Sequence, residues 1–169
     1  MRLFKNHIFF IGLLFSFYNS SAQSDCVCCS DFHKQFDFWV GEWNVYDTAG
    51  NMVGENTIAK LESGYIINEH WQGASGGSGR SYNYFNQSDS TWNQVWIDSQ
   101  GNNLVLKGRA ESNKMILSSE LIPGKKIDFY RNRITWTSNI DDTVSQLWEI
   151  LNEDGEVVSA AFNGLYKRK

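Results

Sequence analysis

Three segments of the chain alternate a polar side chain with large apolar ones at every second residue. The three sets are Ile67, Glu69 and Trp71; Trp92, Gln94 and Trp96; and Val144, Gln146 and Trp148. Alternate residues of a β-strand share a face, so each set predicts one face of a strand. A buried carboxyl or amide is costly unless it is hydrogen-bonded, whereas a ligand cavity combines aromatic walls with a few directed polar groups. The pattern therefore predicts a cavity for a small hydrophobic or amphipathic molecule.

The same pattern has two other interpretations. Small barrels are often filled by their own side chains, and some of these tryptophans would then cover the outside or a closed end. A carboxyl between apolar walls also acquires the raised pKa of a general base, which would make the protein a hydrolase or isomerase acting through Glu69. We predict that the protein binds the small molecule without catalysis.

Arginines are the expected partners of an acidic group in such a cavity. Arg109, Arg131 and Arg133 could place a guanidinium near an acidic ligand head group or near Glu69. Of these, Arg133 joins the predicted ligand-binding set. The glycine-rich loop from Ala74 to Gly79 is predicted to be a mobile lid at the mouth of the cavity.

Nucleophilic catalysis has little support in the sequence. Gly73 to Gly77 match the G-x-S-x-G pattern, with Glu69 and His70 close by. A nucleophile elbow, however, is a strained turn from a strand to a helix, and this segment joins two predicted strands. Ser75 is therefore read as a loop residue, and alternation places His70 on the outer face or the rim. No catalytic residue is predicted.

All three cysteines lie before the first predicted strand, in Cys26-Val27-Cys28-Cys29. With His33 they could form a soft-metal or redox site, but zinc sites usually separate their cysteines by two to four residues. We therefore predict no metal site and keep these four residues as weak candidates. An odd number of cysteines also leaves a thiol that is free or paired between chains. Cross-linking through it would suit a third function, a structural or interaction domain.

The N-terminal segment has the features of a signal peptide. Arg2 and Lys5 precede an apolar run from Ile8 to Tyr18, and small residues end at Ala22. The run is too short to span a membrane as a helix. We expect cleavage after Ala22, a leader over 23–35 and one barrel domain over 36–169. The expected location is periplasmic or extracellular.

The charge of the mature chain argues against two classes of partner. Without residues 1–22 it keeps 13 basic and 19 acidic residues, a net charge of −6. Its longest basic cluster is Lys167-Arg168-Lys169, so we expect neither nucleic acid nor an anionic membrane surface as a partner. The oligomeric state is left open.

Ten short segments with turn residues between them predict an all-β protein. The predicted strands cover 42–47, 52–61, 65–73, 80–85, 91–98, 103–110, 114–121, 125–138, 143–151 and 157–167. Short sequential turns favour an up-and-down meander, and closing the meander removes its two exposed edges. We therefore predict a closed antiparallel β-barrel, preceded by a short helix around Ser30 to Phe36 that Ser30 or Asp31 caps.

The run Phe36-Asp37-Phe38-Trp39-Val40-Gly41-Glu42-Trp43 is predicted to enter the core as a strand, because aromatic side chains suit a pleated surface. It resembles the opening signature of a bacterial family of secreted domains of unknown function. Later segments resemble that family's other landmarks in the same order: Trp92 to Asp98, Arg133 to Trp136, Gln146 to Glu149 and Tyr166 to Lys169.

This resemblance implies a calycin-like barrel, related in architecture to lipocalins and fatty-acid-binding proteins. Nitrobindins, barrels of similar design, ligate haem through a late histidine. This chain has no histidine after His70, so haem is not expected by that route. From the residues themselves we expect Trp39 and Trp43 to close one end of the barrel. The Tyr166-Lys167-Arg168 stem is expected to stack over one of them.

Overall fold

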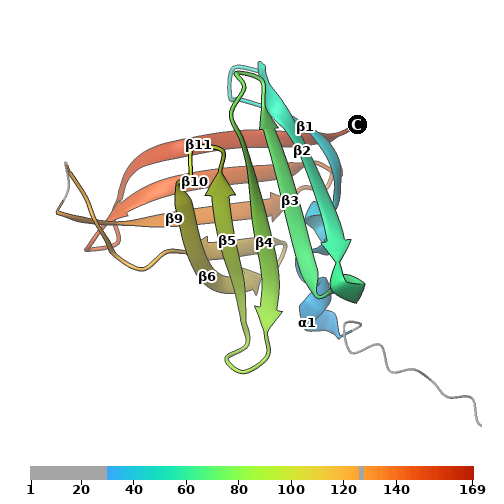
Figure 1. Cartoon of the computed structure of the whole chain (residues 1–169), viewed down its shortest axis with the longest axis horizontal. Helices are drawn as coiled ribbons and strands as arrows, with labels where there is room; N and C mark the ends of the chain where they lie inside the picture. Colours follow the sequence, from blue (N-terminus) through green and yellow to red (C-terminus); the bar gives the residue numbers. More distant parts are fainter. Residues whose placement is uncertain (1–29, 126–127) are drawn as a thin grey trace, which may run out of the picture.

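Short strands joined by polar turns pair in sequence order and close into a barrel (Figure 1). The computed structural model describes residues 30–125 and 128–169. The strands are β1 (Gly41–Tyr46), β2 (Met52–Leu61), β3 (Ile66–Gly73), β4 (Ser78–Asn86), β5 (Thr91–Asp98), β6 (Asn103–Glu111), β7 (Lys114–Ser118), β8 (Ile122–Pro123), β9 (Phe129–Ser138), β10 (Val144–Asn152) and β11 (Val157–Arg168).

The barrel is closed by two pairings that connect distant parts of the chain. β11 pairs with β1, and β9 pairs with β10 as well as with β7. Every pairing is antiparallel, and the two-residue β8 extends the edge of β9. Ten strands thus form the closed barrel, which confirms the predicted fold class.

Aspartates form the turns of two hairpins in the same way. The Asp47 Oδ1 atom accepts the N–H groups of Ala49 at 2.9 Å and Asn51 at 2.8 Å. The Asp98 Oδ1 atom accepts those of Gln100 and Asn102, both at 2.9 Å. Hydrogen bonds from the Asn51 and Asn102 side chains and the turn amides lower the pKa of both aspartates. Such hydrogen bonds from turn amides to an Asp or Asn side chain explain why these residues predict turns.

The prediction of a strand through the whole aromatic run was wrong in its first half. Asp37–Trp39 is a 3₁₀ helix, η2, and β1 begins only at Gly41. The turn of η2 folds the chain across the barrel, so that Phe36 and Trp39 become fully buried. Covering an open barrel end outweighs the strand preference of aromatic residues here.

The predicted N-terminal helix is present as α1 (Asp31–Lys34), but its predicted cap is absent. The Ser30 side chain makes no capping bond; its Oγ atom lies 2.6 Å from Nδ1 of His33. Two strands are also shorter than predicted, since β7 ends at Ser118 and β9 begins at Phe129.

The segment before β1 closes one end of the barrel, called the closed end below. Figure 1 shows α1 in blue beside the end of β2 and the start of β3. Phe32 stacks on Phe85 with ring centres 5.4 Å apart, and the Trp92 indole donates to Oε1 of Gln35 at 3.1 Å. The segment is thereby fixed to β4 and β5 by stacking and by a hydrogen bond.

Four buried aromatic residues, the closed-end cluster, fill this end of the barrel: Phe36, Trp39, Trp92 and Trp136. Phe36 stacks on Trp39 at 4.9 Å and meets Trp136 at 5.3 Å and Trp92 at 5.7 Å. Trp39 is therefore part of the closure, as predicted.

Trp43 is also buried, and its indole donates to the Trp39 carbonyl at 2.9 Å. The Arg168 guanidinium lies 4.3 Å from the centre of the Trp43 ring, which confirms the predicted stacking. A Cβ atom on Gly41 would lie 2.4 Å from Nη1 of Arg168, and φ there is +147°. The positive φ favours glycine at this position, whereas the flexible end of the Arg168 side chain could move away from a Cβ atom.

Within residues 30–125 and 128–169, no helix is long and apolar enough to cross a membrane. The predicted signal peptide and the three cysteines lie outside the described residues.

Candidate ligand-binding cavity

All three predicted strand faces point into the barrel, and their corresponding positions lie in the same order along it. Strands β3, β5 and β10 run in the same direction, from the closed end towards the opposite end, which we call the mouth. Each of them therefore presents an apolar residue first, a polar residue next and a tryptophan last. The first position of each set is buried in the core. The polar and tryptophan positions line a cavity above it.

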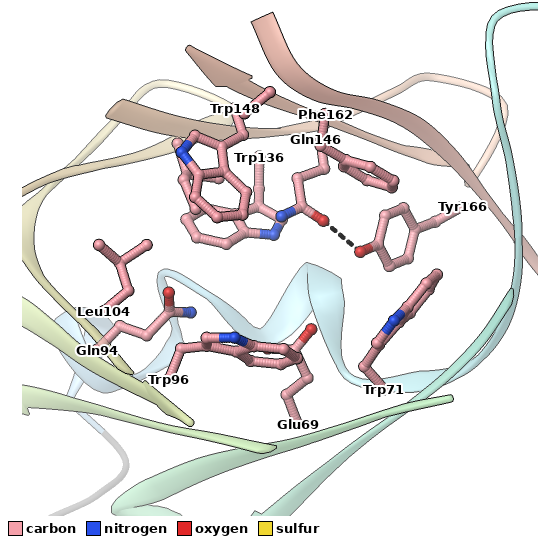
Figure 2. Close-up of a pocket in the computed structure, with 12 residues that line it drawn as sticks. Glu69, Trp71, Gln94, Trp96, Leu104, Trp136, Gln146, Trp148, Phe162 and Tyr166 are labelled. Carbon is pink, nitrogen blue, oxygen red and sulfur yellow. Dashed lines mark hydrogen bonds between the residues drawn. The ribbon is translucent and has the colours of Figure 1, made fainter. Parts of the chain in front are cut away.

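The cavity has a volume of about 200 Å³. Its lining residues are Glu69, Trp71, Gln94, Trp96, Leu104, Ile134, Trp136, Gln146, Trp148, Ala161, Phe162 and Tyr166. Six of the eight predicted site residues are among them: Glu69, Trp71, Gln94, Trp96, Gln146 and Trp148. Figure 2 shows their side chains converging on a common space.

Two predicted site residues lie elsewhere. Trp92 is the first inward residue of β5, where it packs in the closed-end cluster rather than against the cavity. Arg133 is on the outer face of β9, because its neighbours Asn132 and Ile134 are the buried residues of that strand. Its Nε atom lies 3.0 Å from Oε2 of Glu149, the residue that it pairs with on β10.

The other two arginines also lie away from the cavity. Arg131 shares the outer face of β9 by alternation. Arg109 is exposed and donates to the carbonyls of Ser90 at 3.3 Å and Asp89 at 3.4 Å. None of the three arginines therefore lies near Glu69 or lines the cavity, so the prediction that Arg133 belongs to the binding site was wrong.

A chain of hydrogen-bonded side chains, the polar belt, crosses the barrel interior at the level of Glu69. Oε1 of Glu69 accepts from Nδ2 of Asn56, and Oε2 accepts from Oγ of Ser81, both at 2.7 Å. Ser81 accepts in turn from Nδ2 of Asn83 at 2.9 Å. Gln94 donates to Oδ1 of Asn83 at 2.7 Å. One carboxyl is thus connected to strands β2, β4 and β5.

The belt continues to the far side of the barrel. Nδ2 of Asn56 lies 3.4 Å from the Tyr166 hydroxyl, which donates to Oε1 of Gln146. Figure 2 marks this last contact with a dashed line. The belt therefore also includes residues of β10 and β11. Its polar groups are largely paired with each other, as is usual for buried polar groups, whereas Oδ1 of Asn56 has no partner among the described residues.

Glu69 is the ionisable group at the centre of the belt. The residue is 5% exposed. Burial raises the pKa of its carboxyl to about 7, an effect that the hydrogen bonds from Ser81 and Asn56 partly oppose. Burial and the charge of Glu69 also raise the pKa of Tyr166 well above its usual value. Among the described residues that line the cavity, none is Lys, Arg or His.

Four aromatic residues surround the outer part of the cavity and are called the mouth aromatics: Trp71, Trp96, Trp148 and Phe162. Phe162 meets the edge of Trp71 at 6.3 Å. The indole of Trp148 is oriented by its hydrogen bond to Oδ1 of Asn132, at 2.8 Å. The rings come from β3, β5, β10 and β11 and so enclose the space from several sides.

Two of these rings pack against glycines on the neighbouring strands. A Cβ atom on Gly54 would lie 2.5 Å from Cη2 of Trp71, and one on Gly79 would lie 2.3 Å from Cζ2 of Trp96. Each indole thus lies against bare backbone, where any larger residue would displace it towards the cavity. Aromatic rings often cover strand glycines in this way.

The predicted lid is a shorter and more constrained segment than expected. Ser78 and Gly79 belong to β4, so the loop is reduced to Ala74–Gly77. The Gly73 N–H donates to the Gly77 carbonyl at 2.7 Å, and the Ala74 N–H donates to Val53 of β2 at 2.9 Å. The segment is a hairpin turn attached to β2, with Ser75 inside it.

His70 lies on the outer face, as predicted. It borders a surface groove together with Arg80 and Tyr82. His33, the fourth weak metal candidate, is buried between Tyr65 and Phe85 with ring centres 5.3 and 5.4 Å away. No group of three His, Cys, Asp or Glu side chains suited to a metal occurs in the described part of the chain.

Sequence reasoning missed two kinds of site residue. The belt residues Asn56, Ser81 and Asn83 are small and polar, a type that occurs on both faces of strands. The missed aromatic residues are Trp136 on β9 and Phe162 and Tyr166 on β11, all of which line the cavity. On β9, the alternation of Asn132, Ile134 and Trp136 could have indicated the inward face. The prediction was based instead on the arginines of the opposite face.

Comparisons with known proteins add no family assignment. The chain matches no protein-family model, and a search of curated proteins also finds no match.

Proposed function

We propose that this protein binds a small amphipathic molecule inside its barrel and does so without catalysis. The observation that carries the proposal is the layered interior: a packed closed end, a polar belt above it, and an aromatic-walled cavity above the belt. Aromatic walls with a few directed polar groups are the usual composition of small-molecule sites.

The volume of the cavity limits the size of the ligand. A cavity of about 150 Å³ in a protein core accommodates benzene. The 200 Å³ found here therefore suits a molecule with one ring or a short branched chain. Gln94 and Gln146 supply amide groups at its inner surface, and Glu69 supplies a carboxyl.

A screen of single-ring compounds tests this proposal. Binding is followed by tryptophan fluorescence, since three cavity tryptophans lie at the mouth, and is confirmed by calorimetry. We expect saturable binding that Trp96→Ala weakens about tenfold or more, because loss of a large contact surface costs more than about 1.4 kcal/mol. Arg133→Ala is the matched control, since its side chain lies on the outer face of the same barrel.

The proposal is wrong if no compound binds saturably, or if Trp96→Ala and Arg133→Ala weaken binding equally. Native mass spectrometry of protein from its own source provides an independent measurement. We expect an additional mass that disappears on denaturation.

One observation favours a second function, a hydrolase or isomerase that uses Glu69. A general acid or base works best when its pKa is near the working pH, and Glu69, with a pKa of about 7, lines the cavity. The enzyme hypothesis predicts turnover whose rate follows the ionisation of one group near pH 7 and which Glu69→Gln abolishes. Binding with no turnover by wild-type protein favours the first function.

We also propose that binding takes place outside the cytoplasm, in the periplasm or the extracellular medium. The support is the basic, then apolar, then small-residue order of residues 1–22. Membership of the bacterial family of secreted domains is proposed on the Phe36–Trp43 run. N-terminal sequencing of the exported protein tests cleavage after Ala22; an uncleaved cytoplasmic protein would refute it.

A further inference from the structure

We propose that the ligand is a small organic cation, an amine or a quaternary ammonium compound, whose positive charge sits between Glu69 and the mouth aromatics. This inference rests on the proposed function and specifies its ligand class.

The cavity wall carries acidic groups and no basic ones among its described lining residues. The ionisable groups of its described lining residues are one carboxyl and one phenol, and both become negative when they ionise. Buried carboxylates are normally paired with a cation. Both oxygens of Glu69 instead accept from neutral donors, the amide of Asn56 and the hydroxyl of Ser81. The cavity can therefore supply a negative charge that the lining residues do not balance.

The arginines near the barrel are held away from the cavity. Arg133 is held on the outer face by Glu149, and Arg109 by backbone carbonyls. An acidic ligand would thus find no guanidinium in the cavity and would be repelled by an ionised Glu69. A cationic ligand would find the opposite charge with its hydrogen-bonding partners already in place.

Aromatic rings enclose the cavity on several sides. A cation is attracted to the faces of aromatic rings, most strongly to Trp, and a group of such rings is a known way to hold quaternary ammonium groups. Three tryptophans and Phe162 surround the outer part of this cavity, and Trp136 and Tyr166 also line it. Figure 2 shows a carboxyl oxygen of Glu69 directed into the space between Trp96 and Trp71. The carboxyl and the rings therefore act on the same volume.

Calorimetry with matched pairs of probes tests the inference. Choline is compared with 3,3-dimethyl-1-butanol, which has nearly the same shape without the charge, and benzylamine is compared with benzyl alcohol. At pH 8 we expect the cation of at least one pair to bind about tenfold or more tightly than its neutral partner, because the aromatic rings and the carboxylate attract only the charged member.

The pH dependence of the affinity tests whether Glu69 is the group that binds the cation. From pH 8 to pH 6 the affinity for the cation should fall about tenfold, because Glu69, with a pKa of about 7, becomes protonated. The other groups that face it are Asn56 on β2 and Ser81 on β4, which do not titrate, and Tyr166 on β11, which stays protonated. Affinity for the neutral partner should not change.

Glu69→Gln should remove both the preference for the cation and its pH dependence while the neutral probes still bind. Arg133→Ala should change neither. Equal affinity within both pairs for wild-type protein overturns the cation inference, and binding of the neutral members would then leave the proposed function standing. Failure of every single-ring compound to bind overturns the proposed function itself.

Discussion

The two ends of the barrel interior use the same residue types for different purposes. In the closed-end cluster, Phe36 and Trp39 stack with ring centres 4.9 Å apart, and Trp136, which also lines the cavity, lies 5.3 Å from each of them. At the mouth, Trp71 and Trp96 lie against Gly54 and Gly79 and face a cavity. The difference is whether another side chain fills the space in front of the ring.

Between the two ends, the polar belt separates a core from a site. Below it the chain before β1 contributes Phe36 and Trp39, which fill the barrel. Above it no described segment crosses the interior, so the rings face an open space. Aromatic content alone is therefore no indicator of a binding site; the chain that covers one end decides which tryptophans become core.

The largest expected difference between the two ends is in stability. Trp39→Ala should lower the free energy of unfolding by about 3 to 5 kcal/mol, since it leaves a cavity among packed rings. Trp96→Ala should cost about 1 to 2 kcal/mol, because that ring already faces a cavity on one side. Urea denaturation of the two variants measures both values. Equal losses would contradict the division into a core and a site.

The belt between them should make stability depend on pH. The pKa of Glu69 is about 7 in the folded protein and near 4.5 in the unfolded chain, so the folded protein holds this proton more tightly. The protonated Glu69 carboxyl therefore contributes fully to the free energy of unfolding below pH 4.5, and this contribution is lost as the pH rises through 7. From pH 5 to pH 8 this loss amounts to about 2 to 3 kcal/mol.

Denaturation of wild-type protein and Glu69→Gln at both pH values measures the effect, which the variant should lack. Asp47 and Asp98 titrate below this window, because hydrogen bonds lower their pKa. An equal pH dependence in both proteins would show that Glu69 is not the group responsible.

The smallest stability effect is expected where a glycine supports a mouth ring. Alanine at Gly79 would place Cβ 2.3 Å from Trp96, and the ring can move into the cavity. Gly79→Ala should therefore cost only about 1 kcal/mol and still weaken ligand binding strongly. Gly77→Ala is the matched control, since nothing lies within 4 Å of its Cβ position. Comparable binding by both variants would argue against this role of Gly79.

The predictions that succeeded share a simple physical basis. Alternation is enforced by the geometry of every strand, and a closed barrel has one inside and one outside. Glu69, Gln94 and Gln146 were therefore assigned to the interior correctly from their apolar neighbours. The strand bounds of Met52–Leu61 and Thr91–Asp98 were also correct, because turn residues mark both of their ends.

The predictions that failed depended on long-range geometry. Arg133 was assigned to the cavity from its charge, but the burial of Asn132 and Ile134 fixes the face of β9 and turns Arg133 outward. Asp37–Trp39 was predicted as strand from its aromatic residues, but covering the barrel end requires the chain to turn. Charge and composition carry no information on either requirement.

Trp92 and Trp96 show where sequence information ends for this protein. Their common face follows from a spacing of four residues in a strand, so the sequence by itself determined that both point inward. Only the tertiary structure decided that Phe36 packs against Trp92 while Trp96 borders the cavity. The reason is that side-chain direction is a local property of the strand, whereas filling the space in front of a ring depends on segments distant in the chain.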